Sequence, residues 1–413
     1  MTLEGDWLRL YQETVIDTQS VCQKIEETAR VNTEKVLRAF QKARVSDFHL
    51  KGSTGYGYND LARETLEEVY AEVFSSEAAL VRSQIVSGTH AIALCLYGIL
   101  RPGDELLAVQ GTPYDTLAAI IGINSNESGS LKEYGITYRQ VELLPDGTPD
   151  YQAIKQAINS RTKMVMLQRS RGYSLRPALT IDRMKELIDF IRGQKPDVVI
   201  LVDNCYGEFV EEREPTQIGA DLVAGSLIKN PGGGLAPTGG YVVGKNKYVQ
   251  MAANRWTAPG IGWEVGPSPD YVRLLFQGIF LAPSFVSEAL QGMVFAARLF
   301  ERLGYDTSPA YTDFRSDIIQ AVILNSPQKV IAFCQAIQAS SPVDAHVRPE
   351  PVDMPGYTDQ VIMAAGTFIQ GASLELSADA PMRPPYIVYL QGGLSRHHTR
   401  LAVIQAARAL QML

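Results

Sequence analysis

Cysteine and histidine are scarce in this chain, which has four cysteines and five histidines among its 413 residues. The cysteines are scattered and no two have CxxC spacing, so the sequence predicts neither a zinc site nor a disulfide framework. The histidines, including the adjacent His397 and His398, also lack the spacing of metal ligands. We therefore expect no metal site, and we expect a protein of a reducing cytoplasm.

Basic charge and long apolar runs are also missing. Lysine and arginine number 38 against 45 aspartates and glutamates, a net charge of -7, which disfavours a nucleic-acid partner because phosphates must be neutralised. The longest apolar run, AIALCLYGIL at 91–100, is about half the length that a bilayer crossing needs. The first 15 residues mix charges from the start, unlike a secretory signal. We expect neither a nucleic-acid nor a membrane partner.

The length and the 46% hydrophobic content predict a globular protein of more than one domain. Residues 1–50 have helical periodicity and predict an N-terminal helical arm. Short apolar runs then alternate with helix-like segments, which predicts a mainly parallel sheet between helices over 51–290, an α/β fold. A long helix at 284–305 leads into a smaller C-terminal α+β domain, residues 291–413. Its strand candidates are KVIAF at 329–333 and YIVYL at 386–390.

Polar residues follow several of the apolar runs in the predicted sheet. Asp203 comes directly after VVILV, and Ser226 and Lys229 end the run LVAGSLIK. Gly88 and Thr89 open an apolar helical segment, where free backbone N–H groups can hold a phosphate. Because ligands of open parallel sheets bind beyond the carboxyl ends of the strands, we expect these residues to share one site.

Two interpretations of Asp203 and Lys229 are compatible with their spacing. They could form a structural ion pair, since a buried aspartate needs a positive partner. Alternatively, Asp203 meets the protonated pyridine nitrogen of pyridoxal phosphate while Lys229 forms an imine with the aldehyde, and the phosphate lies at Gly88 and Thr89.

Three further features have both a functional and a structural interpretation. Tyr114, in QGTPYDT, is placed to stack on an aromatic ring or to belong to a surface turn. The glycines of residues 232–234 give the backbone room beside a ligand or form a flexible turn. GGYVVGK at 239–245 matches the spacing of a nucleotide loop, but Asn246 stands where magnesium binding needs serine or threonine. We reject the nucleotide loop.

Several long stretches resemble the aluminium-resistance proteins, a branch of the pyridoxal-phosphate enzymes of cysteine and methionine metabolism related to the cystathionine lyases. They are GYGYND, VRSQIVSGTHAI, QRSRGY, VDNCYGEFVE and AGSLIKNPGGGLAPTGGY. The resemblance covers nearly the whole chain after the first few dozen residues. It implies the fold-type-I architecture of pyridoxal-phosphate enzymes and a homodimer or homotetramer with active sites at the subunit interface.

The resemblance also implies residue roles. Lys229 matches the Schiff-base lysine, Asp203 the partner of the pyridine nitrogen, and Tyr114 the stacking and catalytic tyrosine. The phosphate ligands are matched by Gly88, Thr89 and Ser226, with Tyr56 reaching the phosphate from a neighbouring subunit. The implied activity is β- or γ-elimination from a sulfur-containing amino acid such as cystathionine, cysteine or methionine. Replacement at the same carbons, or cofactor binding with a non-catalytic role in metal tolerance, are the alternatives.

One departure from the related lyases concerns the substrate. They carry an arginine in a late strand for the substrate carboxylate, whereas the corresponding run here, YIVYLQGG, has none. Arg383 in MRPPY is the nearest substitute, and Arg169 and Arg171 in QRSRGY compete with it.

Overall fold

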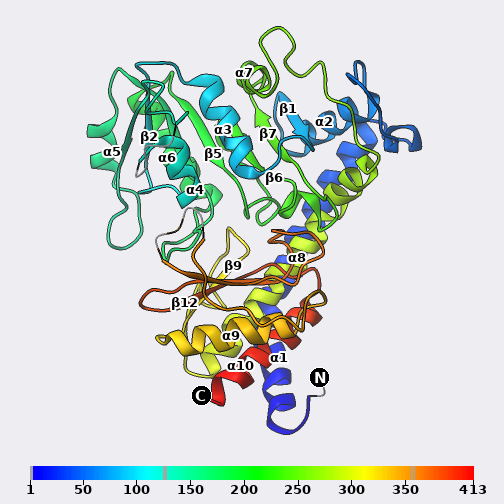
Figure 1. The fold of residues 1–413 in the computed structure, drawn as a ribbon, viewed down its shortest axis with the longest axis vertical. Coiled ribbons are helices and arrows are strands. Elements are labelled where there is room, and N and C mark those ends of the chain that lie inside the picture. The colour runs from blue at the N-terminus through cyan, green and yellow to red at the C-terminus, as the bar shows by residue number, and fades with distance from the viewer. Residues whose placement is uncertain (1–2, 124–127, 355–356, 358) are drawn as a thin grey trace.

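A computed structural model describes residues 3–123, 128–354, 357 and 359–413. Its larger part is a seven-stranded sheet with helices on both faces, and its smaller part is a five-stranded sheet beyond one end of the larger one (Figure 1). The long helices α1 (Gly5–Lys42) and α8 (Val272–Arg302) run side by side from one part to the other. Arg298 and Arg302 of α8 both bind Asp17 of α1, which ties the two helices together.

The seven-stranded sheet has the order β1-β7-β6-β5-β4-β2-β3. Its strands are parallel except for β7, which pairs antiparallel with β6 and β1. The predicted mainly parallel sheet between helices is thus confirmed. The strands are β1 (Ala78–Arg82), β2 (Glu105–Ala108), β3 (Thr137–Gln140), β4 (Thr162–Gln168), β5 (Val199–Asp203), β6 (Leu222–Ser226) and β7 (Gly240–Gly244). The rejected nucleotide loop is therefore strand β7 followed by helix α7 (Asn246–Trp256).

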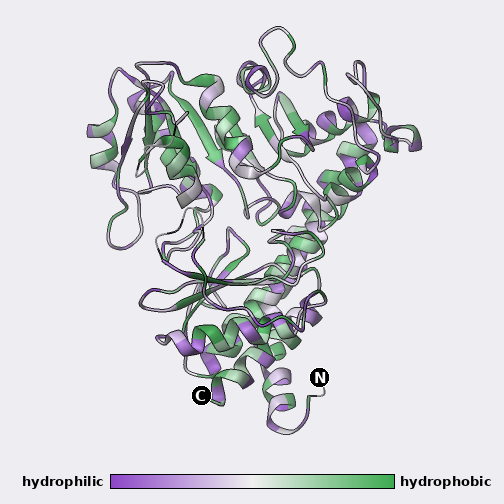
Figure 2. Ribbon diagram, in the orientation of Figure 1, coloured by the Kyte–Doolittle hydropathy of each residue, from purple (hydrophilic) through white to green (hydrophobic). Residues whose placement is uncertain are grey.

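Two apolar layers cover this sheet, one on each face. Residues of β5 alternate between them, with Val199 and Leu201 in one layer and Ile200 and Val202 in the other. All five residues of β5 are buried, and Figure 2 shows it as a hydrophobic strand. One layer holds α3 (Gly88–Ile99), α4 (Asp115–Ile121) and α7 (Asn246–Trp256), and the other holds α2 (Leu61–Val73), α6 (Ile181–Gln194) and α8. The short helix α5 (Tyr151–Ala157) joins β3 to β4.

Helix α8 is longer than the sequence pattern predicts. It begins at Val272 instead of 284 and continues through Pro283. Its length and apolar composition would suit a membrane span, but 72% of its most apolar window is buried inside the protein. α8 is therefore a core helix that both parts of the molecule share.

The smaller sheet is antiparallel, with the order β10-β11-β12-β9-β8. Its strands are β8 (Asp306–Ser308), β9 (Ile319–Ile323), β10 (Val361–Ala364), β11 (Ser377–Pro381) and β12 (Ile387–Gln391), and α9 (Pro327–Ala339) and α10 (Arg396–Gln411) pack with it. The predicted strand YIVYL is confirmed as β12, whereas the prediction for KVIAF is wrong because it lies in α9. Ser326 caps this helix by accepting a hydrogen bond from the Lys329 N–H, and Pro327 occupies its first position.

Candidate active site

A cavity of about 690 Å³ lies at the carboxyl ends of the central parallel strands. Its walls come from the segments after β2, β4, β5 and β6, from the start of α3, and from β9 and β12 of the smaller sheet. Eight of the ten candidate residues that the sequence singles out line it: Gly88, Thr89, Tyr114, Arg171, Asp203, Ser226, Lys229 and Arg383. The topology brings them together because parallel strands place their carboxyl ends at one edge.

Asp203 and Lys229 lie deep in this cavity. Asp203 is the last residue of β5 and is 4% exposed, and its carboxylate accepts a hydrogen bond from the Cys205 N–H at 3.1 Å. Burial raises the pKa of Asp203, and the positive charge of Lys229 opposes that rise. Burial by itself would lower the pKa of Lys229, but Cys205, Tyr206 and Asp203 outweigh it, so this pKa lies above its ordinary value. No ion pair within 4 Å joins the two among the described residues.

Tyr206 is a site residue that sequence reasoning missed. The Lys229 Nζ atom lies 3.8 Å from the centroid of its ring. The backbone of Tyr206 has a φ of 71°, a left-handed conformation that costs free energy in a residue other than glycine. Its place three residues after the strand-end aspartate Asp203 could have drawn attention to it. The positive φ is not visible in the sequence.

The start of α3 forms a cradle beside the end of β6. Ser87 caps the helix by accepting from the His90 N–H, and the N–H groups of Gly88 and Thr89 donate to no oxygen within the described part of the chain. A Cβ atom at Gly88 would lie 3.3 Å from the Ser226 Cβ and 3.1 Å from the Cys205 Sγ. The close approach of helix and strand therefore depends on glycine at this position, and it leaves two free donors that can hold a phosphate.

Tyr114 closes the cavity on the side of β2. Its hydroxyl lies 3.2 Å from the Thr89 Oγ1, which ties the loop after β2 to the start of α3. Burial raises the pKa of Tyr114, and the charge of Asp203 acts in the same direction. Tyr114 therefore faces the cavity as a neutral phenol, and it belongs to the site instead of a detached surface turn.

Tyr56, the predicted phosphate ligand from a neighbouring subunit, does not line the cavity. It is 74% exposed, and its ring lies 5.6 Å from that of Tyr58, which is also exposed. Both rings therefore lie on the surface of their own chain.

The arginines differ in what they contact. Arg383 is 54% exposed at the cavity wall and forms an ion pair with Asp359 at 3.1 Å. Arg171 is buried and donates from Nη1 to the Ser308 carbonyl at 2.8 Å. Arg176, which the sequence analysis did not consider, also lines the cavity, and burial lowers its pKa to about 10.

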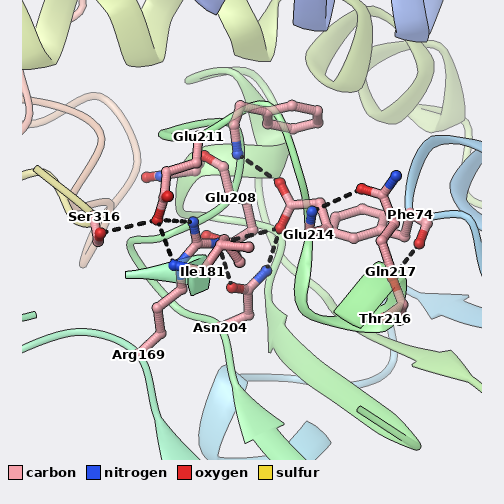
Figure 3. A network of polar contacts seen from close by, with 12 residues as sticks. Phe74, Arg169, Ile181, Asn204, Glu208, Glu211, Glu214, Thr216, Gln217 and Ser316 are labelled. Carbon is pink, nitrogen blue, oxygen red and sulfur yellow. Dashed lines mark hydrogen bonds and ion pairs between the residues drawn. The ribbon is translucent and has the colours of Figure 1, made fainter. Parts of the chain in front are cut away.

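Arg169 is not part of the cavity wall. It is fully buried behind the loop after β5, where its guanidinium contacts Asn204, Glu211 and Glu214 (Figure 3). Its role as a competitor for the substrate carboxylate is therefore unsupported, because both sides of its guanidinium meet protein carboxylates.

Comparison with known proteins supplies the family. Residues 7–411 match the family model of methionine gamma-lyase. The chain belongs to the methionine gamma-lyase family. Enzymes of this family are lyases that depend on pyridoxal 5'-phosphate, so the predicted cofactor and enzyme class are confirmed. At the family level the activity is that of a carbon–sulfur lyase.

Three relatives show how far the likeness extends. The Bacillus subtilis protein YnbB is 53% identical over 96% of this chain and 95% of its own. A Listeria innocua protein, provisionally named a cystathionine beta-lyase involved in aluminum resistance, is 52% identical with a TM-score of 0.96, over 98% of this chain and 99% of its own. A Clostridium novyi structure described as a carbon-sulfur lyase involved in aluminum resistance is 47% identical with a TM-score of 0.94, over 98% of this chain and 96% of its own. The predicted family and fold are thereby confirmed.

Proposed function

We propose that the protein cleaves a carbon–sulfur bond of a sulfur-containing amino acid by β- or γ-elimination, with its cofactor bound to Lys229. The observation that carries this proposal is the convergence in one cavity of Asp203, the buried last residue of β5, and Lys229, which lies three residues beyond the end of the adjacent parallel strand β6. A structural ion pair would need neither the cavity nor the free donors of Gly88 and Thr89 beside it.

The residues fit the cofactor as follows. Pyridoxal phosphate supplies an aldehyde that bonds an amine and a protonated ring that withdraws electrons from the substrate α-carbon. Lys229 would hold the aldehyde carbon, and Asp203 would keep the ring nitrogen protonated. The donors of Gly88 and Thr89, together with the Ser226 hydroxyl, would hold the phosphate. Tyr114 would lie against the ring.

Each of these side chains then has a task during turnover. Lys229, displaced by the substrate amine, would take the α-proton as general base. Burial raises the pKa of Asp203, whereas Lys229 and the Cys205 N–H favour its charged form, and a protonated ring nitrogen beside it would favour that form further. Tyr114 would donate a proton to the leaving sulfur, since burial raises its pKa and keeps the phenol protonated.

We propose Arg383 as the ligand of the substrate carboxylate, with Arg176 as the competing group. Arg383→Met and Arg176→Met would separate them: the variant that lacks the carboxylate ligand should raise KM at least tenfold, and the other should not. A raised KM in both variants would mean that the two guanidinium groups share the carboxylate.

We propose that a second copy of the chain completes the site. Tyr56 and Tyr58 are exposed and lie outside the cavity of their own chain. A neighbouring copy that brought Tyr56 to the phosphate would bury both rings. Tyr56→Phe should then weaken cofactor binding. Mixing Tyr56→Phe chains with Lys229→Ala chains should restore active sites, because one chain supplies Lys229 and its neighbour supplies Tyr56. A monomer could not be restored in this way.

Absorbance and product release test the activity. The purified protein should show a visible band that borohydride removes and that Lys229→Ala lacks. Incubation with cystathionine, cysteine and methionine should release an oxoacid and ammonia. The protein could instead be yellow, release no oxoacid from any of the three, and exchange their sulfur group for an added thiol. That outcome would show that the activity is replacement and not elimination. A protein that never takes up the cofactor would contradict the whole proposal.

A further inference from the structure

A buried carboxylate of the smaller sheet lies behind the cavity wall opposite Lys229. Asp379 of β11 is 6% exposed, and its Oδ2 atom accepts two hydrogen bonds. One comes from the Tyr173 hydroxyl at 2.8 Å and the other from the Gln391 side-chain amide at 2.7 Å. Tyr173 and Gln391 both line the cavity, so they connect the carboxylate to it.

Tyr173 is held firmly in the wall by aromatic contacts. Its ring lies 5.4 Å from that of Tyr389 and 6.1 Å from that of Tyr357. Tyr173 and Tyr206 pack against the same apolar cluster of the smaller sheet, and Tyr206 contacts Lys229. An aromatic surface therefore runs from Lys229 to Tyr173, with the Asp379 carboxylate at its end.

We propose that Tyr173 and Asp379 form a proton-transfer pair that serves the substrate in this cavity, a second pair beside Lys229 and Tyr114. The proposal rests on the proposed lyase function. A substrate amine must lose a proton before it can react, and a leaving sulfur must gain one. The pair can carry that one proton between the two.

The proton balance closes without any further reactant. The Tyr173 oxygen takes a proton from the substrate ammonium while the Tyr173 hydroxyl proton moves to Asp379 Oδ2, so one N–H bond and one O–H bond break and two O–H bonds form. When the carbon–sulfur bond breaks, Tyr173 gives a proton to the sulfur anion and recovers one from Asp379. The pair returns to its starting state, and no electrons are gained or lost by the protein.

The surroundings of Asp379 suit this role. Burial raises its pKa to about 6, against the opposing effects of Tyr173, Gln391 and Lys229. The other titratable groups that face it are the Cys334 thiol of α9 and Tyr389, which pairs with Asp379 from the neighbouring strand β12. Burial raises the pKa of both, so both are neutral near pH 7.

Infrared spectroscopy of the holoenzyme tests the pair without any substrate. Difference spectra between pH 5 and pH 8 should show a carboxylic-acid band that titrates near pH 6 and is absent in Asp379→Asn. Tyr173→Phe should move the midpoint to a higher pH, because the Tyr173 hydroxyl stabilises the carboxylate. Tyr389→Phe is the matched control and should leave the midpoint unchanged. A midpoint that Tyr173→Phe does not move would overturn the proposal.

Kinetics test the transfer itself, with whichever of cystathionine, cysteine and methionine the enzyme cleaves. Tyr173→Phe should lower kcat about 100-fold, the order expected for loss of a general acid–base group, with KM within threefold. In Asp379→Asn the decline of kcat/KM below pH 6 should disappear. Activity of Tyr173→Phe within threefold of wild type would overturn the proposal. If the wild type cleaves none of the three, the lyase proposal fails and the infrared titration alone decides on the pair.

Discussion

The Nζ atom of Lys229 lies 3.8 Å above the ring of Tyr206, a residue whose own backbone is left-handed with a φ of 71°. An ammonium over an aromatic face is stabilised by about 0.5–2 kcal/mol. The strain at Tyr206 and the contact with Lys229 therefore occur at one place, as is common where a site must be held in a defined geometry.

This contact predicts a difference between two substitutions of Tyr206. Tyr206→Phe keeps the aromatic face and should leave kcat/KM within about threefold of wild type. Tyr206→Leu removes the face and should lower kcat/KM by roughly 3- to 30-fold, because the position of Lys229 is no longer held. Steady-state kinetics on both variants check this. Equal losses in the two variants would mean that the hydroxyl, and not the ring face, matters.

The close packing at Gly88 predicts that the substitution Gly88→Ala lowers cofactor affinity while the protein still folds. In Gly88→Ala the new methyl group would lie 3.1 Å from the Cys205 Sγ and 3.3 Å from the Ser226 Cβ, so the start of α3 must move away from β6. We expect the dissociation constant for pyridoxal phosphate to rise about tenfold, the equivalent of about 1.4 kcal/mol. Titration of the apoprotein, followed by the visible band, measures it.

The control for Gly88 is a second helical glycine. Gly193 in α6 has no atom within 4 Å of an added Cβ. Gly193→Ala should leave cofactor affinity unchanged and stabilise the fold by about 0.5–1 kcal/mol, because alanine is the better helix former. Similar losses of cofactor affinity in both variants would contradict the proposal that the start of α3 holds the phosphate and needs glycine at position 88.

How much the sequence predicts depends on the range of the interactions. Asp203, Ser226 and Lys229 could be found because a strand of buried residues followed by a polar one has a local pattern. The strand prediction for KVIAF is wrong because a short, mostly apolar run fits a strand as well as one face of a helix, and the cap at Ser326 carries the deciding signal. A short apolar run of this kind can be assigned to a helix or a strand only together with its flanking residues.

The remaining site residues could not be found locally. Tyr173 matters because it reaches Asp379, which lies 206 positions further along the chain. In the sequence, Arg169 of QRSRGY is a competitor of Arg383 for the substrate carboxylate. Only the packing of α1, the loop after β5 and the loop before β9 shows that it is enclosed by carboxylates. Contacts across such separations leave no periodic pattern in a single sequence.

Glu208 predicts a specific dependence of stability on pH. It is fully buried, it accepts a hydrogen bond from the Tyr241 hydroxyl at 2.7 Å, and its second oxygen has no partner among the described residues. Burial raises its pKa to about 8 from 4.5. The folded state therefore keeps a proton that the unfolded chain releases, so this stabilisation is complete below about pH 4.5 and is lost as the pH rises to about 8.

The test compares Glu208→Gln with wild type at pH 5 and pH 8. Glutamine mimics the protonated side chain, so the free energy of unfolding of the variant should lack this decline. Wild type should lose on the order of 4 kcal/mol more than the variant over that range, since one pKa unit is worth about 1.4 kcal/mol. Urea unfolding measures both. The exposed Glu212→Gln should behave like wild type; a variant at position 208 that declines equally would show that Glu208 is already ionised in the fold.

Arg169 predicts a large cost for removing one buried charge. Its guanidinium lies 3.2 Å from a carboxylate oxygen of Glu211 and 3.2 Å from one of Glu214 (Figure 3). Arg169→Met leaves these carboxylates without their cation and should destabilise the fold by about 3–5 kcal/mol.

The same chemical change at an exposed pair provides the comparison. Arg213 binds Asp182 at the surface, where solvent weakens the interaction, so Arg213→Met should cost less than about 1 kcal/mol. Arg169 also fills the space beneath Gly207, where an added Cβ would lie 2.4 Å from the Arg169 Cδ. Its loss should therefore loosen the loop that carries Tyr206, and Arg169→Met should weaken cofactor binding as well as stability. Urea unfolding together with cofactor titration separates the two effects, and a destabilised variant with wild-type cofactor affinity would limit Arg169 to a structural role.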